Sequence, residues 1–123
     1  MTGDAKLAML LGALLAALGV TLGAFGAHGL KAVLDAEKLG WWHTGVQYQM
    51  WHAIGLVAIG AAALPGTRGI AILLAIGVLL FSGSLYVMAL TNLRWLGMVT
   101  PLGGLAMIGG WLWFAWKLLK TPS

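Results

Sequence analysis

The chain of 123 residues contains no cysteine, and only 8% of its residues are charged. Without cysteine, neither a disulfide framework nor a thiolate metal site can form. Soluble domains carry about 25% charged residues, which keep their surfaces hydrated. Here hydrophobic residues make up 61% of the sequence, so the composition predicts an integral membrane protein.

Basic residues are also sparse, although they exceed the acidic ones. Seven Lys and Arg stand against three Asp and Glu, which gives a formal net charge of +4. A nucleic-acid-binding surface gathers its basic residues on one face, whereas these are scattered singly along the chain. The sequence therefore predicts no nucleic-acid partner, and we interpret the basic residues as anchors at connections and termini.

Four apolar segments predict an all-α, polytopic membrane protein in which residues 1–123 form a single four-transmembrane-helix bundle. The segments lie at about 6–28, 44–64, 70–91 and 96–118. Each has roughly 20 residues, enough at ~1.5 Å per residue to cross a hydrocarbon core of ~30 Å. The first segment exceeds the ~7–15 apolar residues of a signal peptide, so we interpret it as a retained span.

The first connection is the longest and holds most of the acidic residues. Lys31, Asp35 and Lys38 are spaced by four and three residues, which suits a short amphipathic helix lying at the membrane interface. Gly40 is expected to end this helix, and the tryptophan pair at 41–42 to anchor it. The sequence thus predicts an interfacial helix after the first span.

The end of the last span resembles an interfacial belt of aromatic and basic residues: Trp111, Trp113, Trp116, Lys117 and Lys120. With Lys6 and Arg68, the side that holds both termini carries four basic residues, and the opposite side carries three. This count favours cytoplasmic termini by one charge, and insertion in both orientations stays an alternative.

Small residues recur along the first span at intervals of four and three: Gly12, Ala16, Gly19, Gly23 and Gly26. Such a stripe lets a second backbone approach closely, as in small-xxx-small contacts between membrane helices. The partner is either another helix of the same chain or a second copy, so a homo-oligomer is one expected assembly.

Polar residues from all four spans fall toward the membrane side that faces the first and third connections. His52 follows Gln49 by three residues and Tyr48 by four, so these three share a helix face. Polar groups inside a span are costly and require partners. We therefore predict one polar, ligand-binding pocket in this leaflet, formed by His28, Tyr48, Gln49, His52, Ser82, Ser84, Tyr86 and Thr100.

Four motifs, GAFGAHGLK, YQMWHA, FSGSLY and VTPLGG, occur in this order between residues 23 and 104. In sequence and spacing they resemble the bacterial membrane family called domain of unknown function 423, whose eukaryotic relatives are grouped as transmembrane protein 256-like. The resemblance implies a small four-span protein of the bacterial inner membrane or of mitochondria. It brings no established reaction. Its motif positions coincide with the predicted polar pocket.

Metal binding and hydrolysis are two alternative roles for the residues of this pocket. A copper site would use His28 and His52, with His43 or the soft ligands Met50, Met88 or Met98, but two histidines without a carboxylate or thiolate are few ligands. The alternative is that the two histidines are hydrogen-bonded residues of the core. Ser82 or Ser84 with His52 would lack the orienting carboxylate of a hydrolase triad. We therefore expect no metal, no cofactor and no enzyme.

The leading hypothesis is a small membrane protein whose polar pocket binds a lipid-like ligand or a partner protein. Its expected partners are membrane lipids, a second copy or a small membrane protein. The alternative is a homo-oligomeric transporter or channel component, although no acidic residue lies within a span to couple proton movement. Pro101 would kink the last helix or break it.

Overall fold

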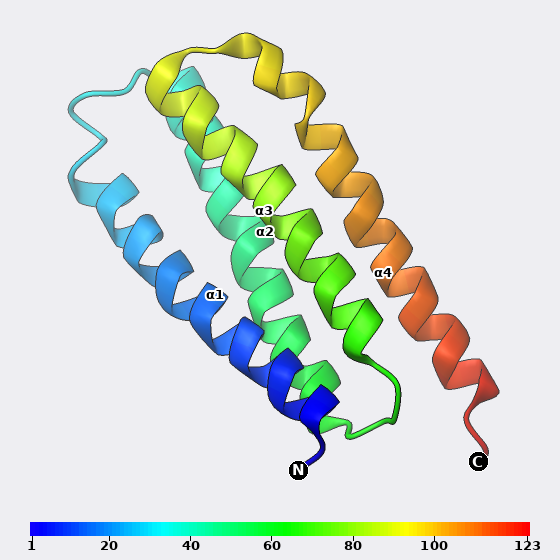
Figure 1. Cartoon of the computed structure of the whole chain (residues 1–123). Helices are drawn as coiled ribbons and strands as arrows, with labels where there is room; N and C mark the ends of the chain where they lie inside the picture. Colours follow the sequence, from blue (N-terminus) through cyan, green and yellow to red (C-terminus); the bar gives the residue numbers. More distant parts are fainter.

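Four α-helices run up and down in the computed structural model, which describes residues 1–123. They are α1 (Gly3–His28), α2 (Ala36–Ala61), α3 (Arg68–Thr91) and α4 (Thr100–Lys120), with a 3-10 helix η1 (Arg94–Met98) before α4. The chain termini and the α2–α3 connection lie at one end, which we call the terminal end; the α1–α2 connection and η1 lie at the other, the η1 end (Figure 1). The all-α architecture predicted from the sequence is confirmed.

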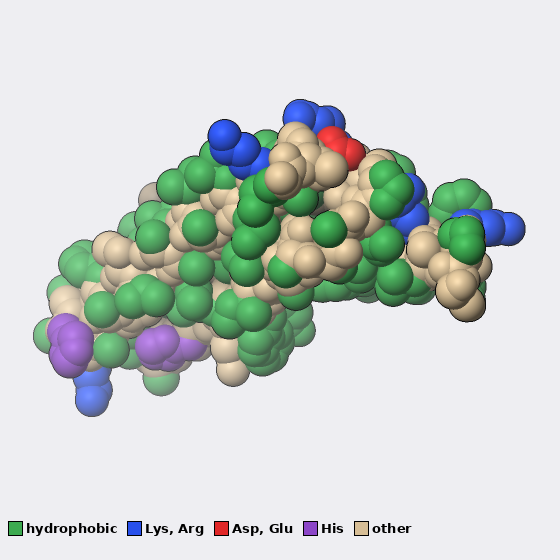
Figure 2. All heavy atoms as spheres, turned by 90° about the horizontal axis from the view of Figure 1, so that it is seen from below, with side chains coloured by type: hydrophobic (Ala, Val, Ile, Leu, Met, Phe, Trp, Pro, Cys, Tyr) green, Lys and Arg blue, Asp and Glu red, His purple; other side chains and the backbone are tan.

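The outer surface of this array is apolar, as a lipid-facing surface must be. Three segments are long and apolar enough to cross a membrane: Gly3–His28, Arg68–Thr91 and Arg94–Lys120. The remaining helix, α2, has 26 residues but carries more polar side chains and does not meet this criterion. Hydrophobic side chains dominate the view in Figure 2, in which the few charged groups lie at the margins. The chain is a membrane protein.

The α1–α2 connection differs from the prediction. Residues 30–34 form a turn, and α2 then begins directly after Asp35, whose carboxylate accepts the backbone N–H of Lys38 at 2.9 Å. This N-cap satisfies a free donor of the first helical turn and so starts the helix here. Because α2 continues through Gly40 without a break, the predicted separate interfacial helix is wrong: its second half is the start of α2.

The start of α4 also differs from the predicted segment at 96–118. The chain leaves α3 through Asn92, a left-handed residue with φ 58°, passes through η1, and begins α4 at Thr100. Pro101 therefore lies in the first turn of α4, where its missing N–H has no acceptor within the helix. It begins the helix and neither kinks nor breaks it.

The small-residue stripe of α1 packs against α2 in an antiparallel register. A Cβ atom built on Gly12 would lie 2.5 Å from the carbonyl oxygen of Ala53, and one on Gly26 would lie 2.5 Å from the Trp42 ring. The stripe is thus used within the chain. The larger of two buried hydrophobic clusters consists of Ala8, Leu56, Ile59, Ile70, Ala71 and Leu74, which come from α1, α2 and α3.

The array is open along one side. The α3 and α4 backbones approach closely at Gly77 and Gly103, and a Cβ on Gly103 would lie 2.7 Å from the Gly77 carbonyl oxygen. The backbones of α1 and α4 do not meet, and neither do those of α2 and α4. Figure 1 shows α1 and α4 on the two outer sides with α2 and α3 between them. A wedge-shaped space between α2 and α4 is therefore left to side chains.

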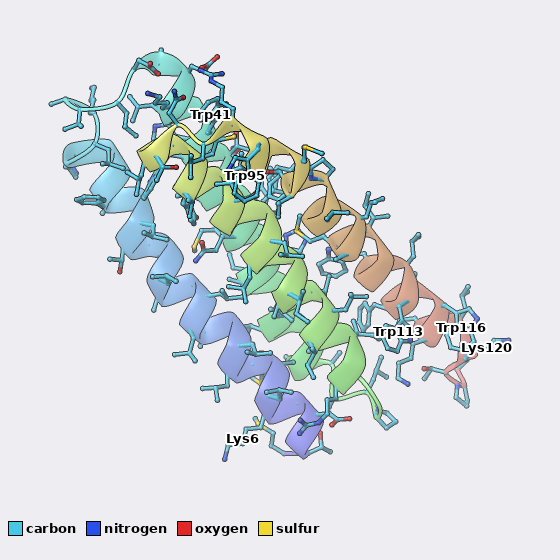
Figure 3. The ribbon with its side chains drawn as sticks, turned by 45° about the horizontal axis from the view of Figure 1, so that its top comes forward. Lys6, Trp41, Trp95, Trp113, Trp116 and Lys120 are labelled. Carbon is cyan, nitrogen blue, oxygen red and sulfur yellow. The ribbon has the colours of Figure 1, made fainter.

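Tryptophans mark two levels along the helices. Trp41 and Trp95 lie at the η1 end, whereas Trp113 and Trp116 lie at the terminal end (Figure 3). From Thr100, the first residue of α4, to Trp113 is ~20 Å of helix, and Trp95 lies beyond Thr100 in η1. Trp42 does not belong to either belt: it is 2% exposed, so its predicted role as an interfacial anchor is wrong.

Candidate functional site

Gln49 links three helices at the centre of the molecule. Its side chain is 2% exposed, and its amide nitrogen donates to the backbone carbonyl of Leu15 in α1 at 2.9 Å. The phenol of Tyr86 in α3 donates to the Gln49 amide oxygen at 2.6 Å. The Tyr86 ring fits beside Gly45, where a Cβ atom would lie 2.7 Å from it. Because each polar group has a partner, this arrangement is stable without water.

The two serines of α3 form hydrogen bonds to different helices, Ser82 to α2 and Ser84 to α4. Ser82 donates to the backbone carbonyl of Gly45 at 2.7 Å, on the same side as Tyr86. Ser84 and Thr100 share a hydrogen bond of 2.6 Å between their hydroxyl oxygens, which ties α3 to the start of α4. Neither serine bonds to His52, so the structure does not bring a serine and a histidine together as nucleophile and base.

His52 forms a separate bridge from α2 to α4. Its Nδ1 lies 2.8 Å from the carbonyl oxygen of Tyr48, and its Nε2 lies 3.0 Å from the indole Nε1 of Trp111. A carbonyl only accepts and an indole N–H only donates, so Nδ1 must carry the proton and Nε2 must accept. These two bonds fix the neutral Nδ1–H tautomer and leave no free lone pair for a metal.

A cleft of about 340 Å³ adjoins this bridge, between α2, α3 and α4. We call it the aromatic cleft; it is lined by Tyr48, His52, Phe81, Gly104, Met107, Ile108 and Trp111. The Tyr48 ring packs against Phe81 and Trp51 with centroids 4.6 and 5.1 Å apart. Its phenol oxygen, unlike that of Tyr86, has no hydrogen-bond partner in the protein. The cleft therefore combines an apolar wall with one free hydroxyl.

His28 lies outside this group of residues, contrary to the prediction. It is an exposed residue at the last position of α1, at the η1 end. Since Gly12 of α1 faces Ala53, His28 lies about 16 residues, or ~24 Å of helix, beyond the level of His52. The two histidines considered as a metal pair are thus far apart, and the chain has no group of three His, Asp or Glu side chains that could hold a metal ion.

The remaining predicted residues meet in three groups and do not form one pocket. Gln49, Ser82 and Tyr86 connect α2 with α3 and α1; Ser84 pairs with Thr100; His52 joins Tyr48 at the aromatic cleft. Leu15 is midway along α1, so the network reaches the middle of the helices and is not confined to the η1 half. The structure thus separates the predicted residues: Gln49, Ser82 and Tyr86 line a pocket of about 190 Å³ of their own, apart from the aromatic cleft. Ligand binding by these residues stays a prediction.

Two tryptophans form hydrogen bonds between helices that the sequence did not predict, Trp111 and Trp42. Trp111 was assigned to the interfacial belt, but it packs over Gly55 and holds His52. Trp111 follows Met107 by four residues and Ile108 by three, which places all three on the cleft-lining face of α4. This spacing could have indicated the position of Trp111 from the sequence. Trp42 donates from its indole nitrogen to the carbonyl of Leu22 at 2.9 Å, which no sequence pattern indicates.

Trp111→Phe should lower the free energy of unfolding by about 1 kcal/mol more than Trp113→Phe. Both changes remove the same part of an indole ring, and both rings pack on a glycine, Gly55 or Gly69. Only Trp111 donates a hydrogen bond, and its loss strands Nε2 of His52. The free energies are measured by unfolding titration in mixed micelles. Equal losses in the two variants would show that the Trp111–His52 hydrogen bond makes no net contribution to stability.

Comparison with known proteins places the chain in a family. The family described as "Protein of unknown function (DUF423)" matches residues 22–104. The UPF0382 membrane proteins SH2409 of Staphylococcus haemolyticus and YwdK of Bacillus subtilis are each 48% identical over 112 residues. These alignments cover 87% of this chain, with 90% of SH2409 and 91% of YwdK.

A relative from Escherichia coli, the UPF0382 inner membrane protein YgdD, is 42% identical over 97 residues, covering 75% of this chain and 73% of the relative. No solved structure matches the chain. We call Gln49, Ser82 and Tyr86, with their hydrogen bonds, the central network. The matched range, residues 22–104, includes these three residues and the His52–Tyr48 pair. The resemblance drawn from the four sequence motifs is confirmed, and the chain belongs to the DUF423 family of membrane proteins.

Proposed function

We propose that the protein binds a lipid-like molecule in the aromatic cleft, as a non-enzymatic protein of the bacterial inner membrane. The observation that carries the proposal is the phenol of half-buried Tyr48, which lines the cleft, is not sealed inside the protein and makes no hydrogen bond within it. At membrane depth no bulk water is available, and a hydroxyl without a partner there costs free energy. Tyr86, the other tyrosine of the chain, has its phenol fully engaged by Gln49. A ligand acceptor at Tyr48 would satisfy the remaining hydroxyl.

The shape of the cleft suits an elongated apolar molecule. Phe81, Met107 and Ile108 form an apolar wall, and Ile108 is 58% exposed toward the surrounding lipid. The α2 and α4 backbones do not approach each other, so a chain can enter between them from the side. An acyl or isoprenoid chain would lie along this wall, with a carbonyl, ester or quinone oxygen accepting the Tyr48 hydrogen bond.

We also propose that α2 is a fourth span. Its two neighbours, α1 and α3, are long and apolar enough to cross a membrane, and its two connections lie at opposite ends of the molecule. If α1 and α3 cross the bilayer, α2 must cross between them. Its buried polar side chains Trp42, Gln49 and His52 each have a partner within the protein, which lowers the cost of placing them in lipid.

Single-cysteine labelling tests this topology cleanly, because the chain has no cysteine of its own. Val33 lies in the α1–α2 connection and Ala62 at the end of α2, and both are exposed. With cytoplasmic termini, a membrane-impermeant maleimide should label Val33→Cys in intact cells and Ala62→Cys only in opened ones. Labelling of both from the same side would mean that α2 does not cross. The reverse pattern would overturn only the orientation.

Tyr48→Phe should weaken binding of a copurifying lipid-like molecule by about five- to tenfold, as the loss of one hydrogen bond of ~1 kcal/mol predicts. Native mass spectrometry of the detergent-solubilised protein measures the retained adduct. Tyr86→Phe is the matched control, since it removes the other phenol oxygen from the chain and leaves the aromatic cleft unchanged.

An adduct that survives Tyr48→Phe at wild-type occupancy would contradict the proposed site. An adduct lost equally in both tyrosine variants would point to a change in the whole fold, so far-ultraviolet circular dichroism and the unfolding free energy of each variant are compared. Ile108→Trp, which should fill the cleft without removing a hydrogen bond, provides a second variant that is expected to displace the adduct.

A further inference from the structure

A second pocket lies at the terminal end, where α4 finishes beside the α2–α3 connection. Its volume is about 360 Å³, and it is lined by Pro65, Trp116, Lys117, Lys120, Thr121 and Pro122. We call it the basic pocket. Its lining includes two lysines, whereas no charged side chain lines the aromatic cleft. It is separated from that cleft along α4 by at least one turn of helix.

The two ammonium groups of the basic pocket have no counter-ion in the chain. The three acidic side chains are all engaged elsewhere: Asp4 with Arg68, Glu37 with Arg94, and Asp35 as the N-cap of α2. In Figure 2, basic side chains at the right-hand edge stand apart from the acidic side chain in view. Lys117 and Lys120 therefore carry positive charge that an external anion can balance.

The backbone around Lys117 provides room for its ammonium group. Gly66 has φ +73°, and a Cβ atom there would lie 2.8 Å from the Lys117 Nζ. A side chain at this left-handed turn position would therefore push the ammonium out of the pocket. Lys120 is held by a different contact, with its Nζ 5.8 Å from the centroid of the Trp116 ring.

Capping of the α4 C-terminus does not account for the two lysines. Thr121 donates its hydroxyl hydrogen to the Lys117 carbonyl at 2.9 Å, and its backbone N–H bonds to the Leu118 carbonyl at 3.2 Å. Threonine therefore occupies two of the last carbonyls, and neither lysine side chain makes a hydrogen bond to them. Both ammonium groups stay free to meet a ligand.

The depth of the basic pocket identifies the kind of anion. Trp113, Trp116 and Lys120 lie together at the terminal end of the molecule (Figure 3). Tryptophan rings sit at the level of lipid headgroups, and lysines reach from helix ends toward the same level. The anions that are concentrated there are the phosphates of acidic phospholipids, which attract lysines close to the membrane surface. Figure 3 shows Lys6 at the same end of the molecule, on α1.

We propose that the basic pocket is a binding site for the phosphate of an anionic phospholipid headgroup. Lys117 and Lys120 pair with the phosphate, Trp116 packs against the glycerol region, and the ordinary bilayer accommodates the acyl chains. This site is independent of the aromatic cleft, where the polar atoms are an imidazole, a phenol and an indole with no charge. Its ligand is defined by headgroup charge, whereas that of the cleft is defined by an apolar chain.

The test compares lipid retention in native mass spectrometry after the protein is equilibrated in mixed micelles with phosphatidylglycerol, phosphatidylcholine or inorganic phosphate. The wild type should retain phosphatidylglycerol over phosphatidylcholine. Lys117→Gln/Lys120→Gln should lower this retention by about 20- to 30-fold, taking roughly a fivefold loss for each lysine near a membrane surface. Lys31→Gln/Lys38→Gln, which removes the same charge at the η1 end, should leave it unchanged.

Three outcomes would overturn the proposal: equal retention of both lipids, equal losses in both double variants, or lysine-dependent binding of inorganic phosphate without retention of phosphatidylglycerol. Lys117→Arg/Lys120→Arg guards against a variant that merely unfolds, since it keeps both charges and should keep the lipid. Gly66→Ala adds a positional test, because it preserves both lysines and should still weaken retention.

Discussion

Gly103→Ala is expected to destabilise the protein by about 2–3 kcal/mol, although it adds a single methyl group. The nearest atoms to a new Cβ are the backbone nitrogen and Cα of Phe81 and the carbonyl oxygen of Gly77, the last at 2.7 Å. Backbone atoms inside a helix cannot rotate away, so α3 and α4 must move apart. Since α4 packs its backbone only against α3 and η1, no other helix compensates for this separation.

Gly40→Ala is the matched control for Gly103→Ala. Gly40 is an exposed helical residue of α2, and a Cβ atom there would meet nothing within 4 Å. Alanine should therefore stabilise the helix by roughly 0.5–1 kcal/mol, because it loses less conformational entropy than glycine. Unfolding free energies measured in mixed micelles compare the two variants. Similar small effects would mean that α3 and α4 are not in the close contact described.

Gln49→Leu should cost about 2 kcal/mol, despite the similar size of the two side chains and the apolar surroundings. The change removes two hydrogen bonds, to Leu15 and from Tyr86, and leaves the Tyr86 phenol without a partner. Hydrogen bonds between membrane helices contribute on average about 0.6 and at most about 1.7 kcal/mol, and an orphaned buried group adds roughly 1–3 kcal/mol. The same unfolding titration measures this loss.

Gln47→Leu, two residues away on the exposed side of α2, should change stability by less than ~0.5 kcal/mol. A double variant sharpens the comparison. In the Gln49→Leu variant, Tyr86→Phe removes the orphaned hydroxyl. The further loss of unfolding free energy caused by Tyr86→Phe should therefore be smaller in this variant than in the wild type. If Gln49→Leu is as mild as Gln47→Leu, the central network does not contribute to the stability of the fold.

The helices could largely be predicted from the sequence because hydropathy and glycine spacing are local signals. The first and third predicted segments, 6–28 and 70–91, fall within α1 and α3 with boundaries shifted by at most three residues. The start of α2 was missed by eight residues, because the cap at Asp35 and the polar first turns resemble a surface helix. Pro101 was misassigned because a proline in the first turn and one within a helix look alike in sequence.

The site could be predicted only in part, because helix rotation decides which polar residues meet. Spacing predicted one shared face for Tyr48, Gln49 and His52, and only Tyr48 and His52 meet at the aromatic cleft. It could not show that Gln49 faces α1 and α3 while His52 faces α4. His28 was included because it lies on the expected membrane side, but at the last residue of α1 it is exposed.

The central network and the aromatic cleft differ in whether their polar groups find hydrogen-bond partners within the protein. Around Gln49 each donor has an acceptor inside the protein, so those residues hold α1, α2 and α3 together. Around Tyr48 a hydroxyl is left over beside a cleft of about 340 Å³. Variants of the network should therefore affect unfolding first, whereas variants of the cleft should affect the ligand first.

Photo-crosslinking with a diazirine-bearing phospholipid or prenyl quinone, followed by peptide mapping, tests the proposed ligand site most directly. Lipid bound in the aromatic cleft should label Phe81, Met107 and Ile108 well above the exposed leucines of α1, Leu10 and Leu14. Tyr48→Phe should reduce the excess labelling of α4. Labelling that simply follows surface exposure, with Leu10 and Leu14 modified as strongly as the cleft residues, would contradict a specific site.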